Sequence, residues 1–257
     1  MAAMMQRVSE PSREGQAGAI AVALATLFGN LFLVLGSLFF GTLSILTAWI
    51  PPRGDWVYFM ARLWSRGLLL SSGIRLTVTA GSQLDPKGRF VFMSNHQSLY
   101  DIPALIQSLP GQARFLAKRS LFQIPIFGWA LKAGGFVSID RKDRSRAGES
   151  FAEAVARLRS GASAVVFPEG TRSLDGRLLP FERGGFLLAI KSGTPIVPVG
   201  ISGSLQVRPR DKWKVRPGTI RVAYGAPIDV RQFGIRGRAE LGDRVRAKMA
   251  ELARCEE

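Results

Sequence analysis

The sequence predicts an α/β fold: a largely parallel sheet flanked by helices, preceded by an N-terminal apolar membrane-associating helical segment. From Gly73 onward, short apolar runs alternate with segments of helical spacing, which is typical of parallel strands joined by crossover helices. Before that point, no Asp, Glu, Lys or Arg occurs from Gly15 through Pro52. We therefore expect two domains, a membrane-associating helical segment over residues 1–72 and an α/β domain over residues 73–257.

The uncharged N-terminal stretch is long enough for more than one arrangement. As a single helix it would extend over about 57 Å, whereas the hydrocarbon core of a bilayer is about 30 Å thick. It is therefore either one spanning helix with apolar extensions or two shorter helices that turn near Gly29-Asn30 or Gly36-Ser37. A buried core helix is the alternative, although soluble helices seldom run so long without charge.

The next segment, Trp56–Ser72, mixes aromatic side chains with Arg62 and Arg66, which share one helical face because they are four residues apart. This composition indicates a helix at the membrane interface, and an ordinary amphipathic docking helix is the alternative. Arginines also follow the apolar stretch closely, at Arg53, Arg62, Arg66 and Arg75. By the positive-inside tendency, we expect the rest of the chain to lie in the cytoplasm.

The α/β part divides into strands and helices by the period of its apolar residues. Strands are expected over Ile74–Thr79, Arg89–Met93, Arg114–Ala117, Phe136–Ile139, Ala164–Phe167 and Ile196–Ile201, with Thr219–Tyr224 as an outer strand. Helices are expected over Ile102–Ser108, Ala147–Arg159, Gly185–Lys191 and Arg238–Arg254. Pro209–Pro217 reads as a basic loop.

The charge balance predicts an anionic partner. Lys and Arg total 35 against 19 Asp and Glu, a formal charge of +16, which suits nucleic acid, an acidic membrane face, a phosphorylated substrate or an acidic protein. The apolar N-terminus, and a body without interleaved basic and aromatic residues, argue against nucleic acid. The chain has one cysteine, Cys255, and one histidine, His96, which excludes a disulfide framework and a Cys-rich or multi-His metal centre.

The single histidine lies five residues before Asp101. On a continuous helix the two side chains would point about 140° apart, so they meet only if His96 lies in a strand-to-helix turn and the helix starts near Ser98. Ser98 would be the N-cap, and Asp101 would lie in the first turn. The carboxylate could then hold one imidazole nitrogen and leave the other as a general base. A structural histidine that caps a turn is the alternative.

A second polar motif, Phe167–Ser173, follows a buried strand. Gly170 lets a ligand approach the backbone, and Arg172 offers a planar fork matched to phosphate. Thr171 offers a hydroxyl, while Glu169 either holds Arg172 or binds a hydroxyl of the ligand. These residue types predict a phosphate or phosphoglycerol site, and a polar turn with an Arg–Glu pair is the alternative.

Together, Asn-His-x-x-x-x-Asp and, some seventy residues later, Phe-Pro-Glu-Gly-Thr-Arg-Ser make a specific pattern. The chain resembles the PlsC-type glycerolipid acyltransferases from about Gly73 to Pro227, and bacterial 1-acyl-sn-glycerol-3-phosphate acyltransferases most of all. Three further segments resemble other blocks of the family: Lys118–Leu121, Gly135–Arg141 and Thr194–Val199. One departure is Phe181-Glu182-Arg183-Gly184, where the family commonly reads Phe-Lys-x-Gly and where Arg183 would replace the lost charge.

The resemblance implies acyl transfer from a thioester to the free sn-2 hydroxyl of 1-acyl-glycerol-3-phosphate (lysophosphatidic acid), forming phosphatidic acid in phospholipid biosynthesis. It assigns His96 as general base, Asp101 as its partner, and substrate binding to Lys118, Arg141, Glu169, Gly170, Thr171 and Arg172. No cofactor or metal is implied; acyl-CoA or acyl-acyl carrier protein is the co-substrate. The expected location is the cytoplasmic face of the inner membrane, on an anionic lipid surface.

Two alternatives to this activity stay open from the sequence. A related acyltransferase could use another acceptor, such as a lyso-ornithine lipid or glycerol phosphate. A membrane protein of the same fold could instead bind anionic lipid without catalysis, as an adaptor. The presence of His96 and Asp101 together with Glu169 and Arg172 argues against the adaptor.

Overall fold

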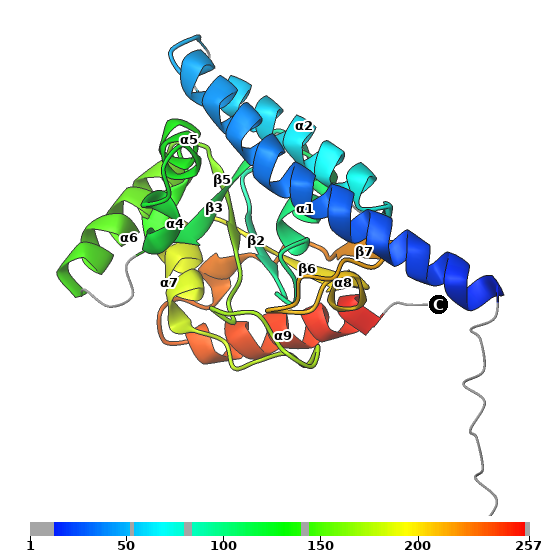
Figure 1. Cartoon of the computed structure of the whole chain (residues 1–257). Helices are drawn as coiled ribbons and strands as arrows, with labels where there is room; N and C mark the ends of the chain where they lie inside the picture. Colours follow the sequence, from blue (N-terminus) through cyan, green and yellow to red (C-terminus); the bar gives the residue numbers. More distant parts are fainter. Residues whose placement is uncertain (1–12, 52–53, 80–83, 140–143, 255–257) are drawn as a thin grey trace, which may run out of the picture.

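The computed structural model describes residues 13–51, 54–79, 84–139 and 144–254. Its centre is a seven-stranded sheet in the order β1-β7-β6-β2-β5-β3-β4 (Figure 1). The five strands from β6 to β4 run parallel, and β7 and β1 run parallel to each other in the opposite direction. The strands are β1 Ile74–Thr79, β2 Val91–Ser94, β3 Ala113–Lys118, β4 Val137–Ile139, β5 Ser163–Val166, β6 Ile196–Ser202 and β7 Gly218–Tyr224.

The α/β prediction, with its largely parallel sheet, is confirmed, but one strand was misplaced. We expected Thr219–Tyr224 at the edge, whereas β7 pairs with β6 on one side and with β1 on the other, so β1 is the edge strand. The burial of the two strands explains this order. Ile220, Val222 and Tyr224 of β7 are buried, while most of β1 after Ile74 is exposed or half-buried.

The helices cover both faces of the sheet. They are α1 Arg13–Thr47, α2 Asp55–Ser71, α3 Asp101–Ser108, α4 Arg119–Phe122, α5 Phe127–Ala133, α6 Arg144–Arg159, α7 Arg183–Ser192, α8 Ser204–Val207 and α9 Arg238–Arg254, with a 3₁₀ turn at Val230–Gln232. The short helices α4, α5 and α8 were not predicted, because four to seven residues give too little periodicity to recognise.

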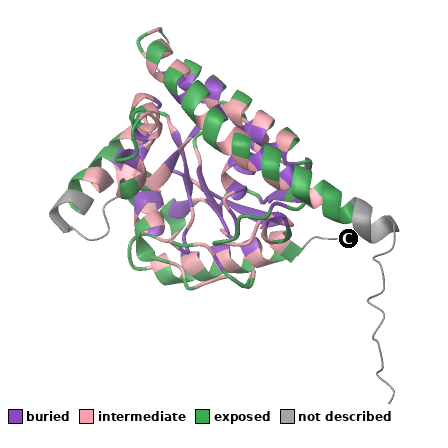
Figure 2. Ribbon diagram, in the orientation of Figure 1, coloured by how far each residue is buried: buried purple, intermediate pink, exposed green. Residues whose placement is uncertain are grey.

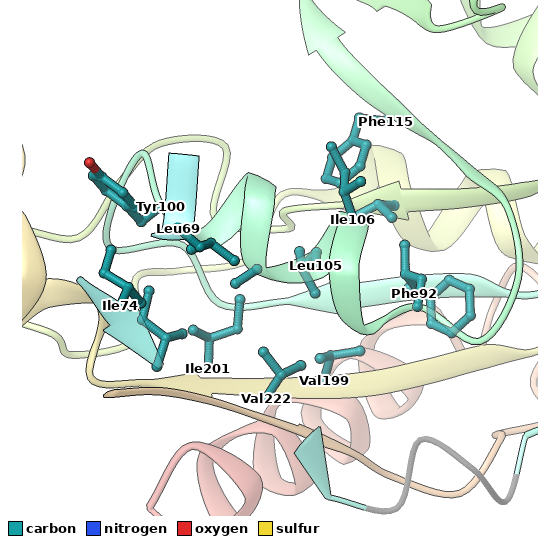
Figure 3. Close-up of a cluster of buried hydrophobic side chains, with 14 of the residues drawn as sticks. Leu69, Ile74, Phe92, Tyr100, Leu105, Ile106, Phe115, Val199, Ile201 and Val222 are labelled. Carbon is teal, nitrogen blue, oxygen red and sulfur yellow. The ribbon is translucent and has the colours of Figure 1, made fainter. Parts of the chain in front are cut away.

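Alternate residues of the central strands pack into two separate cores. Phe92 of β2 belongs to the core under α1, α2 and α3 (Figure 3). Val91 and Met93 belong to the core on the other face, which is covered by α6, α7 and α9. This alternation follows from the two-residue period of a strand, and it places β2 at the centre of the domain.

The apolar N-terminal stretch is one unbroken helix, α1, and does not turn at Gly29 or Gly36. The glycines instead allow close packing, since a Cβ at Gly29 would lie 2.5 Å from Ser72 Oγ. The helix over residues 18–47 is long and apolar enough to cross a membrane, and only 11% of an 18-residue apolar stretch within it is buried. The exposed stripe along α1 is visible in Figure 2 and is not that of a buried core helix.

One face of the second helix, α2, packs against the α/β part, and its other face stays exposed. Leu68 and Leu69 lie in the same buried core as Tyr100 and Leu105 of the α/β part. Its outer face carries exposed apolar side chains at Trp56, Phe59, Leu63 and Leu70. Because the helices share a core with the sheet, the division into two domains at residue 72 stays a prediction.

Candidate active site

The two predicted motifs emerge together from the sheet. Strands β2 and β5 are neighbours and parallel, with Met93 opposite Val166. His96 follows the end of β2, and Phe167 follows the end of β5, so both motifs lie at the carboxyl edge of the parallel strands. Crevices at this edge are where open α/β sheets bind their ligands.

The pairing of His96 with Asp101 is present. His96 Nδ1 lies 2.8 Å from Asp101 Oδ2, and the same oxygen accepts the backbone N–H groups of Gln97 at 2.7 Å and Ser98 at 2.8 Å. We had expected the helix to begin near Ser98, but it begins at Asp101. Three donors converge on one carboxylate oxygen because residues 96–100 form a tight turn around it.

The contacts of the imidazole determine its chemistry. Asp101 is fully buried, and its carboxylate oxygen accepts from Nδ1, so in the neutral imidazole Nδ1 carries the proton and Nε2 has the lone pair. The His96 side chain is 14% exposed, and the ring stacks on Phe167 with centroids 3.9 Å apart and planes 16° apart. The ring is thus held in one orientation, with one basic nitrogen available.

Glu169 connects the two motifs through the backbone. Its Oε1 accepts the N–H of His96 at 2.9 Å, and its Oε2 accepts the N–H of Leu179 at 2.8 Å. The N–H of Ser173 in turn donates to the carbonyl of His96 at 2.8 Å. Burial raises the pKa of the Glu169 carboxyl above its usual value, and the two N–H donors act in the opposite direction. The Arg–Glu pair weighed for this turn is not what forms: both Glu169 oxygens contact backbone N–H groups.

The turn after Glu169 carries the candidate anion-binding groups. Gly170 has a φ of 70°, a left-handed conformation that favours glycine. The guanidinium of Arg172 is partly exposed, with its Nη2 3.8 Å from Asp211 Oδ1. Arg210 Nη1 donates to Thr171 Oγ1 at 3.2 Å and to the Arg172 carbonyl at 3.3 Å. A second arginine therefore supports this turn.

The remaining predicted residues are less closely tied to this site. Lys118 ends β3, the strand beside β5, and is exposed at the same edge of the sheet. Arg141 lies outside the described residues. Glu182, the departure from the family pattern, precedes α7, and its backbone N–H donates to the Pro168 carbonyl at 2.7 Å. Across the described ranges, no group of three or more His, Cys, Asp or Glu side chains could hold a metal ion.

Sequence reasoning missed two contributors to the site. Asn95 is buried, and its side chain donates to the Ile201 carbonyl at 2.8 Å and accepts the Ile201 N–H at 2.7 Å, which ties the histidine turn to β6. Its place directly before His96 was the available signal. Arg210 was visible only as one of several charges in a basic loop, and nothing local indicated its contact with Thr171.

Comparison with known proteins identifies the family of this chain. A family model described as Acyltransferase matches residues 75–202. The 1-acyl-sn-glycerol-3-phosphate acyltransferase of Pseudomonas aeruginosa is 33% identical over 234 residues, which cover 89% of this chain and 90% of that protein. The chloroplastic 1-acyl-sn-glycerol-3-phosphate acyltransferase BAT2 of Brassica napus is 38% identical over 162 residues, 63% of this chain and 45% of that protein. The chain spans about half the length of its chloroplastic relatives.

A solved structure is similar over nearly the whole chain. The crystal structure of the 1-acyl-sn-glycerophosphate acyltransferase PlsC from Thermotoga maritima superposes with a TM-score of 0.78 at 25% identity, covering 93% of this chain and 99% of that one. The similarity therefore includes the helices that precede the sheet as well as the sheet itself. From its sequence relatives, its motifs and its fold, this chain belongs to the 1-acyl-sn-glycerol-3-phosphate acyltransferase family.

Proposed function

We propose that this protein transfers an acyl group from an acyl thioester to the free sn-2 hydroxyl of 1-acyl-glycerol-3-phosphate and forms phosphatidic acid. The observation that carries the proposal is the 2.8 Å contact between His96 Nδ1 and Asp101 Oδ2, which leaves Nε2 as a base. The Thr171–Arg172 turn is joined to the same loop through the Ser173–His96 backbone bond. A base and an anion-binding turn are what a phosphate-bearing alcohol requires.

The reaction needs a base because a glycerol hydroxyl is a poor nucleophile near neutral pH. As the hydroxyl oxygen attacks the thioester carbonyl carbon, His96 Nε2 takes its proton, and the Asp101 carboxylate stabilises the imidazolium. The tetrahedral intermediate then expels the thiolate, which receives the proton from the imidazolium. The acyl group passes directly to the acceptor oxygen, so no covalent acyl-enzyme and no cofactor take part.

The acceptor phosphate is assigned to the basic groups at the carboxyl edge of the sheet. Arg172 is the principal candidate, because its guanidinium is accessible and its fork matches phosphate oxygens. Lys118 and Arg141 are the further candidates from the family pattern. Gly170 and Thr171 line the approach to the phosphate, and Glu169 acts by holding the turn in place.

An apolar cavity beside the catalytic helix supports an acyl-chain site. It has a volume of about 230 Å³ and lies between α1, α2, α3 and α5. Leu99 and Ile102, three and six residues beyond His96, line it together with Phe40, Trp64 and Phe136. We assign an acyl chain of one substrate to this cavity, since its walls are almost entirely hydrocarbon.

The donor and the location follow from charge and from the apolar helix. Acyl-CoA and acyl-acyl carrier protein are both anionic, so a net charge of +16 suits either donor. The exposed apolar face of α1 and α2 supports association with a membrane. The lysolipid and the product both partition into membranes. We place the catalytic domain on the cytoplasmic face of the inner membrane, facing an anionic lipid surface.

The direct test incubates the purified protein with lysophosphatidic acid and either acyl-CoA or acyl-acyl carrier protein, and identifies the lipid formed. Phosphatidic acid is expected, and His96→Ala is expected to lower its rate of formation by several orders of magnitude while the protein stays folded. Lyso-ornithine lipid and glycerol phosphate serve as competing acceptors. Retained transfer in His96→Ala, or transfer only to another acceptor, would contradict the proposal.

A further inference from the structure

The segment Arg208–Arg216, here called the basic strap, joins the catalytic turns to one another. The Arg208 carbonyl accepts the hydroxyl of Ser98, in the histidine turn, at 2.7 Å. Two residues on, Arg210 donates to Thr171 Oγ1 and to the Arg172 carbonyl. The first half of the strap is therefore in contact with both motifs of the proposed active site.

The second half of the strap is attached to the apolar helix α1. Asn30 Nδ2 donates to the Trp213 carbonyl at 3.0 Å. Thr26 Oγ1 accepts the N–H of Val215 at 3.0 Å and lies 3.2 Å from its carbonyl oxygen. Thr26 and Asn30 are among the few polar residues of this helix and are one turn apart, so they form a matched pair of anchors for the strap.

Around these two anchored positions, the strap exposes cations and an aromatic ring. Trp213 is 72% exposed, and Lys212, Lys214 and Arg216 are exposed as well. Within the described part of the chain, no carboxylate oxygen lies within 4 Å of these three cations. The one acid of the strap, Asp211, pairs with Arg210 at 3.2 Å.

The strap also lies beside the exposed apolar face of α1. At about 100° per residue, Asn30 and Phe32 lie on opposite flanks of the helix, with Leu31 between them. Phe32 faces Gly67 of α2, while Asn30 holds Trp213. The exposed face between the flanks is apolar, with Leu24, Leu27, Leu31, Val34, Leu35 and Leu38. Trp213 and its lysines thus border an apolar surface.

We infer that the basic strap is a lipid-contacting element, in which Lys212 and Lys214 bind anionic headgroups and Trp213 inserts at the membrane interface. A tryptophan flanked by lysines beside an apolar helix is the composition that favours this interface. The strap's contacts with Thr171, Arg172 and Ser98 then join the lipid surface to the active site. This inference rests on the proposed function only in that last step, since the lipid contact is measurable without catalysis.

The first experiment measures the lipid contact directly. The full chain is reconstituted in vesicles of phosphatidylcholine and phosphatidylglycerol that carry brominated acyl chains, which quench nearby tryptophan. The chain has five tryptophans, so the difference between wild type and Trp213→Phe isolates the emission of Trp213. We expect that component to be quenched in anionic vesicles. A Trp213 component that bromolipid leaves unquenched would overturn the inference.

The charge requirement is tested with two double variants that each lose two positive charges. Lys212→Gln/Lys214→Gln alters the strap, and Arg236→Gln/Arg244→Gln alters exposed arginines around the start of α9, on the opposite face of the sheet. Each basic residue near an anionic surface changes binding by about fivefold, so we expect the strap variant to need about twenty-five times more phosphatidylglycerol for half-maximal quenching. The control variant is expected to match wild type, and equal effects of both variants would overturn the inference.

Acyl-transfer activity measures whether lipid contact by the strap affects the active site. The ratio of acyl-transfer rate in anionic vesicles to that in zwitterionic vesicles is expected to exceed one in wild type and to fall toward one in the strap variant. Quenching without any acyl transfer in wild type would reject the proposed function and leave the lipid contact standing. A strap variant with unchanged quenching but impaired use of acyl-acyl carrier protein would show instead that the strap binds an acidic protein, and would overturn the inference.

Discussion

The carboxylate of Glu169 accepts the backbone N–H of His96 at 2.9 Å, across 73 residues of sequence. Its second oxygen accepts the N–H of Leu179, so one buried side chain holds the histidine turn and both ends of the Gly170–Leu178 loop together. The position of the His96 imidazole therefore depends on Glu169, a residue that His96 contacts only through its main chain. Glu169 is a positioning residue, and it is expected to affect stability and rate together.

Replacing Glu169 by glutamine tests this role. The amide offers only one acceptor oxygen, so either the His96 or the Leu179 N–H would face an NH₂ group in a buried site. We expect a loss of about 1–3 kcal/mol in the free energy of unfolding, together with a lower acyl-transfer rate. Denaturation in detergent measures the free energy of unfolding. Glu240→Gln, at an exposed position in α9, is the control and should leave stability unchanged.

The raised pKa of Glu169 predicts a pH dependence. Burial disfavours the charged form, so the folded state binds a proton more tightly than the unfolded state, whose carboxyl titrates near its usual 4.5. The contribution of this group to stability is therefore greatest below that value and declines as the pH rises through the folded-state pKa. The difference in stability between wild type and Glu169→Gln, followed from acid to neutral pH, measures it. A difference in stability that grows with rising pH would contradict the predicted decline in the contribution of Glu169.

Replacing Asp101 by asparagine is expected to lower kcat by about a hundredfold or more. The asparagine oxygen can still accept N–H groups in the turn, but it no longer carries the charge that stabilises an imidazolium. KM for both substrates should change little, because Asp101 is fully buried and does not reach a substrate. Steady-state kinetics measure both parameters, with Asp243→Asn on the exposed side of α9 as control. An unchanged kcat would remove the basis for His96 as general base.

Replacing Arg172 by alanine is expected to raise KM for lysophosphatidic acid by roughly 10- to 100-fold, since a hydrogen bond between charged groups contributes about 1.5–3 kcal/mol. KM for the acyl donor should stay near the wild-type value. Arg177→Ala, in the same loop but largely exposed, is the matched control. If only the donor kinetics changed, Arg172 would belong to the donor site instead of the acceptor phosphate.

Several parts of this protein could be predicted from sequence because they depend on neighbouring residues. Periodicity located the seven strands and the long helices, since burial of one face repeats every two or 3.6 residues. The pairing of His96 with Asp101 was also local, because a five-residue turn brings them together. The uncharged stretch predicted an apolar membrane-associating segment, since soluble helices seldom run so long without charge, but it left one helix or two open, and the structure shows one.

The rest was decided by tertiary structure, because it depends on contacts between residues far apart in the chain. Glu169 was expected to act on Arg172 or a ligand, and its partner proved to be the His96 backbone, 73 residues away. Asn95 holds Ile201 across 106 residues, and Thr26 holds Val215 across 189. The position of β7 inside the sheet follows from the same kind of pairing. Local patterns define which side chains are available, whereas the packing of distant strands and loops decides which of them meet.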